Sequence, residues 1–234
     1  NIRRMAAILT VLSLFLFTSL AAPDAQAATY SFTILDAPGT VDTYPTSINA
    51  SGQVAGYYSD GSHHHGFIYS NGVFTALDGP DATYTEATSI NDNGQVVGNY
   101  IESPSSVVYG FMYSNGTFTT LDRPGAFKTW VYSINAGGQV VGNYEGRYSI
   151  PGFVYSNGAF TILGGLSADS VYPTSINVSG QVTGYYYQNG PDGPGAHGFV
   201  YTNGILGTVT KFNAPGASDT YPASINANGQ VTGS

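Results

Sequence analysis

The sequence predicts an all-β protein, a β-propeller built from four-stranded antiparallel blades. Three observations lead to this prediction: a block that recurs every 42 to 49 residues, tight-turn signals inside each copy, and strands that are apolar on both faces. The composition agrees, because 31 glycines, 19 tyrosines and 12 phenylalanines accompany only 9% charged residues. Such a balance favours short strands and tight turns over charged surface helices.

Two motifs carry the repeat. The first reads Ser-Ile-Asn-x-x-Gly-Gln-Val-x-Gly, and its copies are spaced by 42, 44, 42 and 49 residues. They begin at Ser47, Ser89, Ser133, Ser175 and Ser224. The second motif reads Gly-Phe-x-Tyr and begins at Gly66, Gly110, Gly152 and Gly198. A repeat of this length with two motifs per copy is typical of propellers and solenoids.

Each motif predicts a β-hairpin. An Asn-Gly pair follows the second motif at Asn71-Gly72, Asn115-Gly116, Asn157-Gly158 and Asn203-Gly204. This pair favours a two-residue type I′ turn, in which both positions need a positive φ. In the first motif, the glycine can supply a left-handed residue and the asparagine amide can cap the turn. Two hairpins give four strands per repeat, which is a propeller blade.

The strand faces separate the propeller from its alternative. In Gly66-Phe67-Ile68-Tyr69 the two aromatic side chains point one way and Ile68 points the other, so both faces are apolar. Such a sheet must be covered on both sides, as stacked blades are. A parallel β-helix, another β-repeat solenoid, is the alternative fold. It is disfavoured because it winds without tight antiparallel hairpins.

The first 27 residues predict a signal peptide. Arg3 and Arg4 precede an apolar run from residue 5 to residue 22, and Ala25-Gln26-Ala27 resembles a cleavage site. Residues 28–234 are then expected to form a single propeller-like repeat domain. We expect the protein to be secreted, periplasmic or at the cell surface, with no membrane contact after cleavage.

The ends of the repeat region bear on the number of blades. Residues 31–36 match the strand that follows Asn-Gly in other copies, but no Gly-Phe-x-Tyr motif precedes them. The last Ser-Ile-Asn copy lacks the strands that should follow it. We therefore expect at least five blades and a domain that is incomplete at its C-terminal end.

The charge excludes some partners. Six Lys and Arg residues against 14 Asp and Glu residues give a net charge of −8, which disfavours nucleic acid and anionic membranes as partners. The chain has no cysteine, so packing and hydrogen bonds must stabilise it without disulfides. An extracellular glycan or another protein remains the expected partner.

The repeated blocks resemble the HAF-type extracellular repeats, named after a His-Ala-Phe tripeptide that precedes a Tyr-Ser-x-Gly turn and an Ile-Asn-x-x-Gly-Gln-Val-x-Gly block. Here the tripeptide reads His65-Gly66-Phe67 and His197-Gly198-Phe199, with Tyr109 and Pro151 in place of the histidine in the other copies. Glycine replaces alanine in every copy. The resemblance implies a bacterial exported protein and supplies no established activity or catalytic residue.

Alternate connections of an antiparallel sheet lie at the same end, so the long connections are expected to share one face. We place six aromatic residues in or beside these connections: Tyr44, Tyr84, Trp130, Tyr132, Tyr172 and Tyr221. They are the candidate ligand-binding residues, because aromatic rings stack on sugars. The alternative is a solvated loop face in which the repeated Asp36, Asp78 and Asp122 cap turns. Calcium at these three aspartates is a third, weaker hypothesis, since no Asp-x-Asp-x-Asp-Gly loop is present.

No catalytic motif is recognisable, and no catalytic residue or cofactor is predicted. The adjacent His63, His64 and His65 could hold a transition metal, but they are expected to be structural or solvated, because neighbouring side chains on an extended segment point apart. We expect a non-catalytic binding or structural role. The alternative is a secreted polysaccharide hydrolase or lyase, which would need two convergent carboxylates in different environments.

Overall fold

The computed structural model describes residues 32–166, 168–188, 194–202 and 207–234. The chain divides into residues 1–34 and residues 35–234, and all the secondary structure described lies in the second unit. The predicted signal peptide, residues 1–27, lies outside the described residues. No helix in the described ranges is long and apolar enough to cross a membrane.

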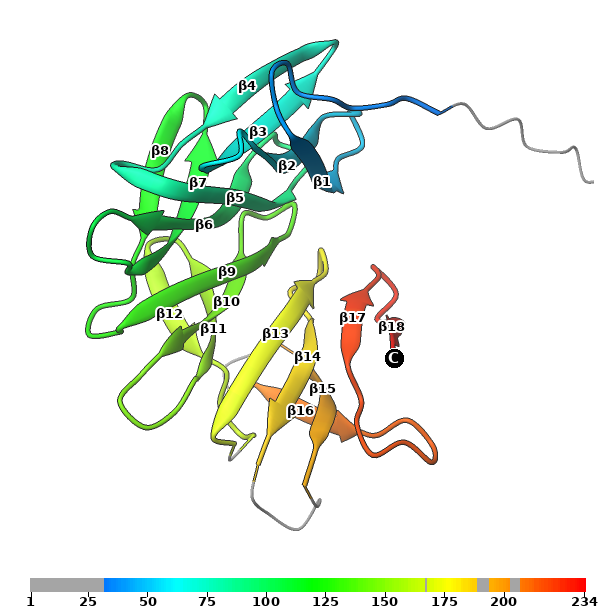
Figure 1. The fold of residues 1–234 in the computed structure, drawn as a ribbon. Coiled ribbons are helices and arrows are strands. Elements are labelled where there is room, and N and C mark those ends of the chain that lie inside the picture. The colour runs from blue at the N-terminus through cyan, green and yellow to red at the C-terminus, as the bar shows by residue number, and fades with distance from the viewer. Residues whose placement is uncertain (1–31, 167, 189–193, 203–206) are drawn as a thin grey trace, which may run out of the picture. The chain divides into compact units, whose positions relative to one another are not determined.

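Antiparallel hairpins build the first blade (Figure 1). Its strands are β1 (Asp42–Ile48), β2 (Val54–Ser59), β3 (His64–Ser70) and β4 (Val73–Leu77). Each strand pairs with the next, so the order in space is the order in sequence. The β1–β2 and β3–β4 turns lie at one end of the blade, and the β2–β3 and β4–β5 connections lie at the other.

Three more blades repeat this plan. The second holds β5 (Ala82–Ile90), β6 (Val96–Glu102), β7 (Val108–Ser114) and β8 (Thr117–Leu121). The third holds β9 (Lys128–Ile134), β10 (Val140–Glu145), β11 (Gly152–Ser156) and β12 (Ala159–Ile162). The fourth holds β13 (Ser170–Ile176), β14 (Val182–Tyr187), β15 (Ala196–Thr202) and β16 (Thr208–Phe212). The paired strands β17 (Pro222–Ile225) and β18 (Val231–Gly233) repeat the first half of the plan.

Parallel β-bridges also join two pairs of consecutive blades. A single parallel bridge between His64 and Tyr84 joins β3 to β5, so the first two blades form one eight-stranded sheet. A similar bridge joins Ile150 to Ser170 between the third and fourth blades. The chain is therefore all-β and consists of propeller blades, and the predicted fold class is confirmed.

The hydrophobic cores lie between blades. The phenylalanine of each Gly-Phe-x-Tyr motif is fully buried: Phe67, Phe111, Phe153 and Phe199. Each of three apolar clusters draws residues from two neighbouring blades, as when Leu77 of the first blade packs with Ile90 and Phe111 of the second. The second and third blades are therefore covered on both faces, as predicted, whereas β1 of the first blade is largely exposed, with Ile48 at 68%.

The predicted type I′ turns are present where the structure describes them. Asn71 has φ 50° and Gly72 has φ 85°, and the Asn115 and Asn157 turns repeat these values closely. The fourth pair, Asn203-Gly204, lies outside the described residues. Residues 32–36, expected to form a strand, form none, and Phe32 is 94% exposed. A β-strand needs a hydrogen-bonded partner, and no Gly-Phe-x-Tyr strand pairs with this segment.

The asparagine of each Ser-Ile-Asn motif joins one blade to the next. The Asn91 Oδ1 accepts hydrogen bonds from the backbone of Asn93 and Gln95, which caps the turn as predicted. Its Nδ2 also donates to the backbone carbonyl of Asn135, 2.9 Å away in the following blade. Asn49, Asn135 and Asn177 make the same contact with the asparagine of the next copy. A continuous asparagine ladder therefore runs along the tight-turn end.

The last glycine of the first motif allows close strand approach. A Cβ at Gly142 would lie 2.0 Å from the carbonyl oxygen of Trp130, on the neighbouring strand. The register shifts between Val141 and Gly142, which leaves Tyr132 as the extra residue of a β-bulge. The corresponding glycine of every blade meets the same obstacle. The bulge is thus built into each blade, and it aims the side chains of the first strand.

Candidate functional site

Five of the six candidate aromatic residues lie in strands. Tyr44 is in β1, Tyr84 in β5, Trp130 and Tyr132 in β9, and Tyr172 in β13, while Tyr221 directly precedes β17. We call β1, β5, β9, β13 and β17 the first strands. Each contacts the first strand of the next blade, and Figure 1 shows them in this succession. The expectation that these rings lie in or beside the long connections holds for Tyr221, which ends the connection before β17. The other five lie within strands, because the strands extend past the motif.

One position of the first strand is aromatic in four of five copies. Three residues before the serine of Ser-Ile-Asn stand Tyr44, Trp130, Tyr172 and Tyr221, and in the second blade Glu86. Strand pairing confirms the equivalence, since Tyr44 faces Tyr57 on β2 and Glu86 faces Asn99 on β6. These side chains form an aromatic row with a single carboxylate in it. Tyr84 lies two residues before this position and Tyr132 two residues after it.

A groove opens along the third and fourth blades. One hollow of about 320 Å³ is lined by Tyr132, Tyr172, Pro173, Thr174 and Tyr185. A second, of about 220 Å³, is lined by Trp130, Tyr132, Asn143, Ile150 and Tyr172. Because Tyr132 and Tyr172 line both hollows, we describe them together as the tyrosine groove. The sequence pattern predicted Trp130, Tyr132 and Tyr172 as candidates, and in the structure these three residues line one hollow.

Tyr132 lines the groove because it differs from the residue at the same position in the other complete blades. At the bulge of the other complete blades stands a threonine, and the Thr174 hydroxyl donates to the carbonyl of Pro222, 2.8 Å away in the next blade. The Tyr132 hydroxyl instead donates to Asn143 Oδ1 at 3.0 Å. Burial raises the pKa of Tyr132 above its ordinary value, so the phenol is a neutral hydrogen-bonding group.

More tyrosines continue the groove toward Tyr221. The rings of Tyr172 and Tyr185 stack at 4.9 Å, and Tyr185 meets Tyr221 edge to face at 5.0 Å. The hydroxyls of Tyr187 and Tyr221 lie 3.3 Å apart, and this hydrogen bond, ahead of burial, raises the pKa of Tyr187 to about 12. Sequence analysis missed Tyr185 and Tyr187. The run of three tyrosines after Gly184 was the signal that could have revealed them.

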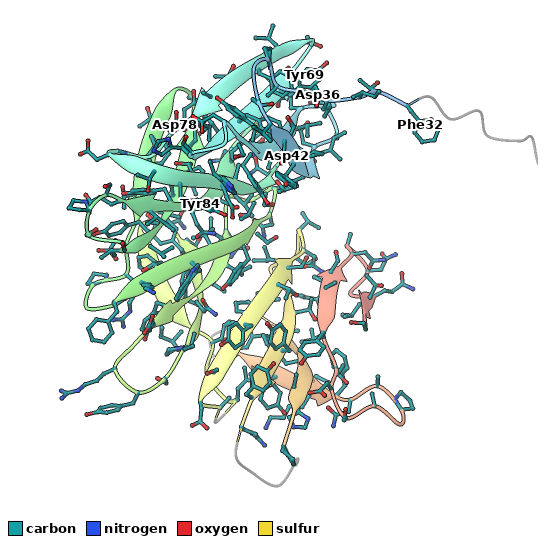
Figure 2. The ribbon with its side chains drawn as sticks, in the orientation of Figure 1. Phe32, Asp36, Asp42, Tyr69, Asp78 and Tyr84 are labelled. Atoms are coloured by element: carbon teal, nitrogen blue, oxygen red, sulfur yellow. The ribbon has the colours of Figure 1, made fainter. Side chains whose placement is uncertain are left out.

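A second aromatic set surrounds Glu86. We call Tyr44, Tyr57, His64, Tyr84 and Glu86 the Glu86 cluster. Its rings form a continuous stack: Tyr44 to Tyr57 at 4.9 Å, Tyr57 to His64 at 5.2 Å, and His64 to Tyr84 at 4.0 Å between centroids. Figure 2 labels Tyr84 on β5. Of the predicted candidates, Tyr44 and Tyr84 lie here, so the six fall into two groups along the succession of first strands.

Glu86 is hydrogen-bonded within this cluster. The His64 Nδ1 lies 3.3 Å from Glu86 Oε1. Burial and then the hydrogen bond to Glu86 raise the pKa of Tyr84 to about 12, and burial and the charge of Glu86 also raise the pKa of Tyr57. The side chains of His64 and Glu86 are 26% and 27% exposed, so solvent still reaches both.

The long connections hold a separate charged group. The ring of His65 lies 3.0 Å from Asp78 and 3.4 Å from Asp60. Hydrogen bonds from the backbone of His63 and Ser62 lower the pKa of Asp60 to about 2. His64 faces Glu86 whereas His65 faces these aspartates, so the adjacent histidines point apart as predicted.

The three weak calcium candidates do not converge. Asp36, Asp78 and Asp122 belong to three successive connections, and Figure 2 labels the first two. Asp78 contacts His65, and Asp122 accepts a long hydrogen bond of 3.5 Å from Thr129. Within the described part of the chain, no three His, Asp or Glu side chains gather as a metal site would require.

No known sequence family matches the chain, and no curated protein matches it. Among solved structures, TolB from Acinetobacter baumannii superposes with a TM-score of 0.49 and 16% identity, over 70% of this chain and 40% of that one. A streptogramin B lyase superposes with a TM-score of 0.47 and 12% identity, over 84% of this chain and 69% of that one. This chain thus spans less than half of TolB.

Proposed function

We propose that this chain is an exported, non-catalytic binding protein that holds an extracellular glycan on its tyrosine groove. The observation that carries the proposal is the juxtaposition of Trp130, Tyr132, Tyr172 and Tyr185 around one open groove. Aromatic faces pack against the C–H faces of sugar rings, and phenol hydroxyls exchange hydrogen bonds with sugar hydroxyls.

The setting of the groove supports a long ligand. Tyr172, Tyr185 and Tyr221 follow one another at ring distances of about 5 Å. Tyr187 and Tyr221 are each 38% exposed, which leaves apolar ring surface in contact with water. An extended polymer could therefore touch rings from more than one blade. The predicted signal peptide and the resemblance to HAF-type extracellular repeats support an extracellular setting for this ligand.

A glycan array probed with the intact protein tests the proposal. We expect saturable binding to one class of polysaccharide. The variants Trp130→Ala and Tyr172→Ala should each weaken it about tenfold or more, since buried aromatic contacts dominate most binding sites. Tyr148→Ala is the matched control, because Tyr148 is 84% exposed and does not line the groove.

Two results would overturn the proposal. One is the absence of binding to any glycan. The other is binding that survives both groove variants. The same incubations also test the alternative, a polysaccharide hydrolase or lyase, since turnover would release new reducing ends or unsaturated products into solution.

A further inference from the structure

The Glu86 cluster differs from the rest of the aromatic row in a way that bears on ligand choice. At the position of Glu86, the other four copies carry an aromatic ring. A carboxylate on a half-buried strand is costly unless it is hydrogen-bonded. The first blade supplies such a bond through His64, whose Nδ1 lies 3.3 Å from Glu86 Oε1 and whose ring stacks between Tyr57 and Tyr84. The substitution is thus accommodated by specific partners.

The partners leave acceptor positions open on the carboxylate. A carboxylate can accept about four hydrogen bonds. His64 accounts for one of them, at Oε1. The side chain of Glu86 remains 27% exposed, so a donor from solution can reach another.

The surrounding rings favour a cationic donor. Tyr44, Tyr57 and Tyr84 belong to one stack beside the carboxylate, and aromatic faces attract ammonium groups. Lys128, on the next first strand, is 4.0 Å from Glu145, so its positive charge is paired. A protonated amine on a ligand would therefore meet a carboxylate and aromatic rings together.

We propose that Glu86 selects glycans that carry free, protonated amino groups, so that the ligand of the aromatic row is an amino-sugar polymer. This inference rests on the proposed function of the tyrosine groove. The sugar rings pack on the groove residues of the third and fourth blades. One ammonium group of the same glycan hydrogen-bonds to Glu86 on the second blade. A single polymer can reach both places, because β5 contacts β9 and β9 contacts β13.

Calorimetric titration with two matched probes tests this inference. The probes are β-1,4-linked oligomers of glucosamine and of N-acetylglucosamine, equal in length, at a pH below the pKa of the glucosamine amines, so that these amines carry a positive charge. We expect the glucosamine oligomer to bind at least about tenfold more tightly. Glu86→Gln should abolish this preference and leave binding of the N-acetylated oligomer unchanged.

Glu102→Gln is the matched control. Glu102 lies on β6 of the same blade, where its Oε2 accepts a hydrogen bond from the Ser105 hydroxyl, and it is not part of the Glu86 cluster. The preference should survive in this variant. A readout that needs no variant is ionic strength: about 1 M salt should reduce the preference of the wild-type protein, because it screens a half-exposed ion pair.

The outcomes separate this inference from the proposed function. Equal affinity for both oligomers, or a preference that survives Glu86→Gln, overturns the role of Glu86. If the protein binds only neutral glycans and this binding is lost in Trp130→Ala, the role of Glu86 is overturned while the proposed function stands. If neither oligomer nor any neutral glycan binds, the proposed function fails first.

Discussion

At the scale of single residues, the asparagine of the Ser-Ile-Asn motif does two things at once. Its Oδ1 caps the turn of its own blade and its Nδ2 reaches the backbone of the next blade. The sequence allowed the first role to be predicted, because Asn-x-x-Gly is a known turn pattern. The second role could not be read from a sequence, since it depends on how closely two blades approach.

Replacing Asn135 with Asp tests the ladder. Its Nδ2 donates to Gln139 Oε1 and to the carbonyl of Asn177, both at 2.9 Å, and Asp has no donor to offer either oxygen. We expect Asn135→Asp to lower the free energy of unfolding by about 2–3 kcal/mol, as measured by denaturant titration. Asn157→Asp, in an exposed Asn-Gly turn, should change it little. Equal effects of the two substitutions would contradict the ladder.

The titration of Tyr84 offers a second test at this scale. Because its pKa is raised to about 12, the folded state holds the phenolic proton more tightly than the unfolded chain does. The stability that this gives is present below about pH 10 and is lost as the pH rises toward 12.

Phenolate absorbance should show this directly. The difference between wild-type protein and Tyr84→Phe should have its midpoint near pH 12, and Glu86→Gln should move that midpoint down. A midpoint that stays unchanged in Glu86→Gln would mean that Glu86 does not hold Tyr84 as described.

At the scale of elements, the bulge in each first strand was the main feature that sequence analysis missed. The strands and both turns of a blade follow from alternation and from Asn-Gly and Asn-x-x-Gly patterns. The bulge arises from the approach of Gly142 to Trp130, which only the paired strands reveal.

Tyr132→Thr tests whether the bulge residue serves binding rather than folding. The substitution restores the threonine found at the bulges of the other complete blades, whose hydroxyl bonds to the next blade. Asn143 loses one donor in exchange. We expect the free energy of unfolding to change by no more than about 1.5 kcal/mol, while glycan affinity falls about tenfold. Loss of stability with unchanged affinity would assign Tyr132 a structural role only.

At the scale of the whole molecule, the repeated motifs determine the architecture, and residues outside the motifs form the candidate site. Blades, turns and inter-blade cores recur because the two motifs recur. Trp130, Tyr132 and Tyr172 were recognisable as candidates because they are large aromatic residues outside the motifs. Tyr185, Tyr187 and Glu86 were not singled out, because their significance depends on which strands become neighbours.

The most direct test of the central claim uses Trp130, the single tryptophan of the chain. Because Trp130 lines the tyrosine groove, its fluorescence reports on occupancy of that groove. As the glycan selected on the array is added, we expect the emission to shift and quenching by acrylamide to decrease. Both changes should saturate at the affinity found by calorimetry. A glycan that binds by calorimetry but leaves Trp130 emission and quenching unchanged would contradict the assignment of the groove as the binding site.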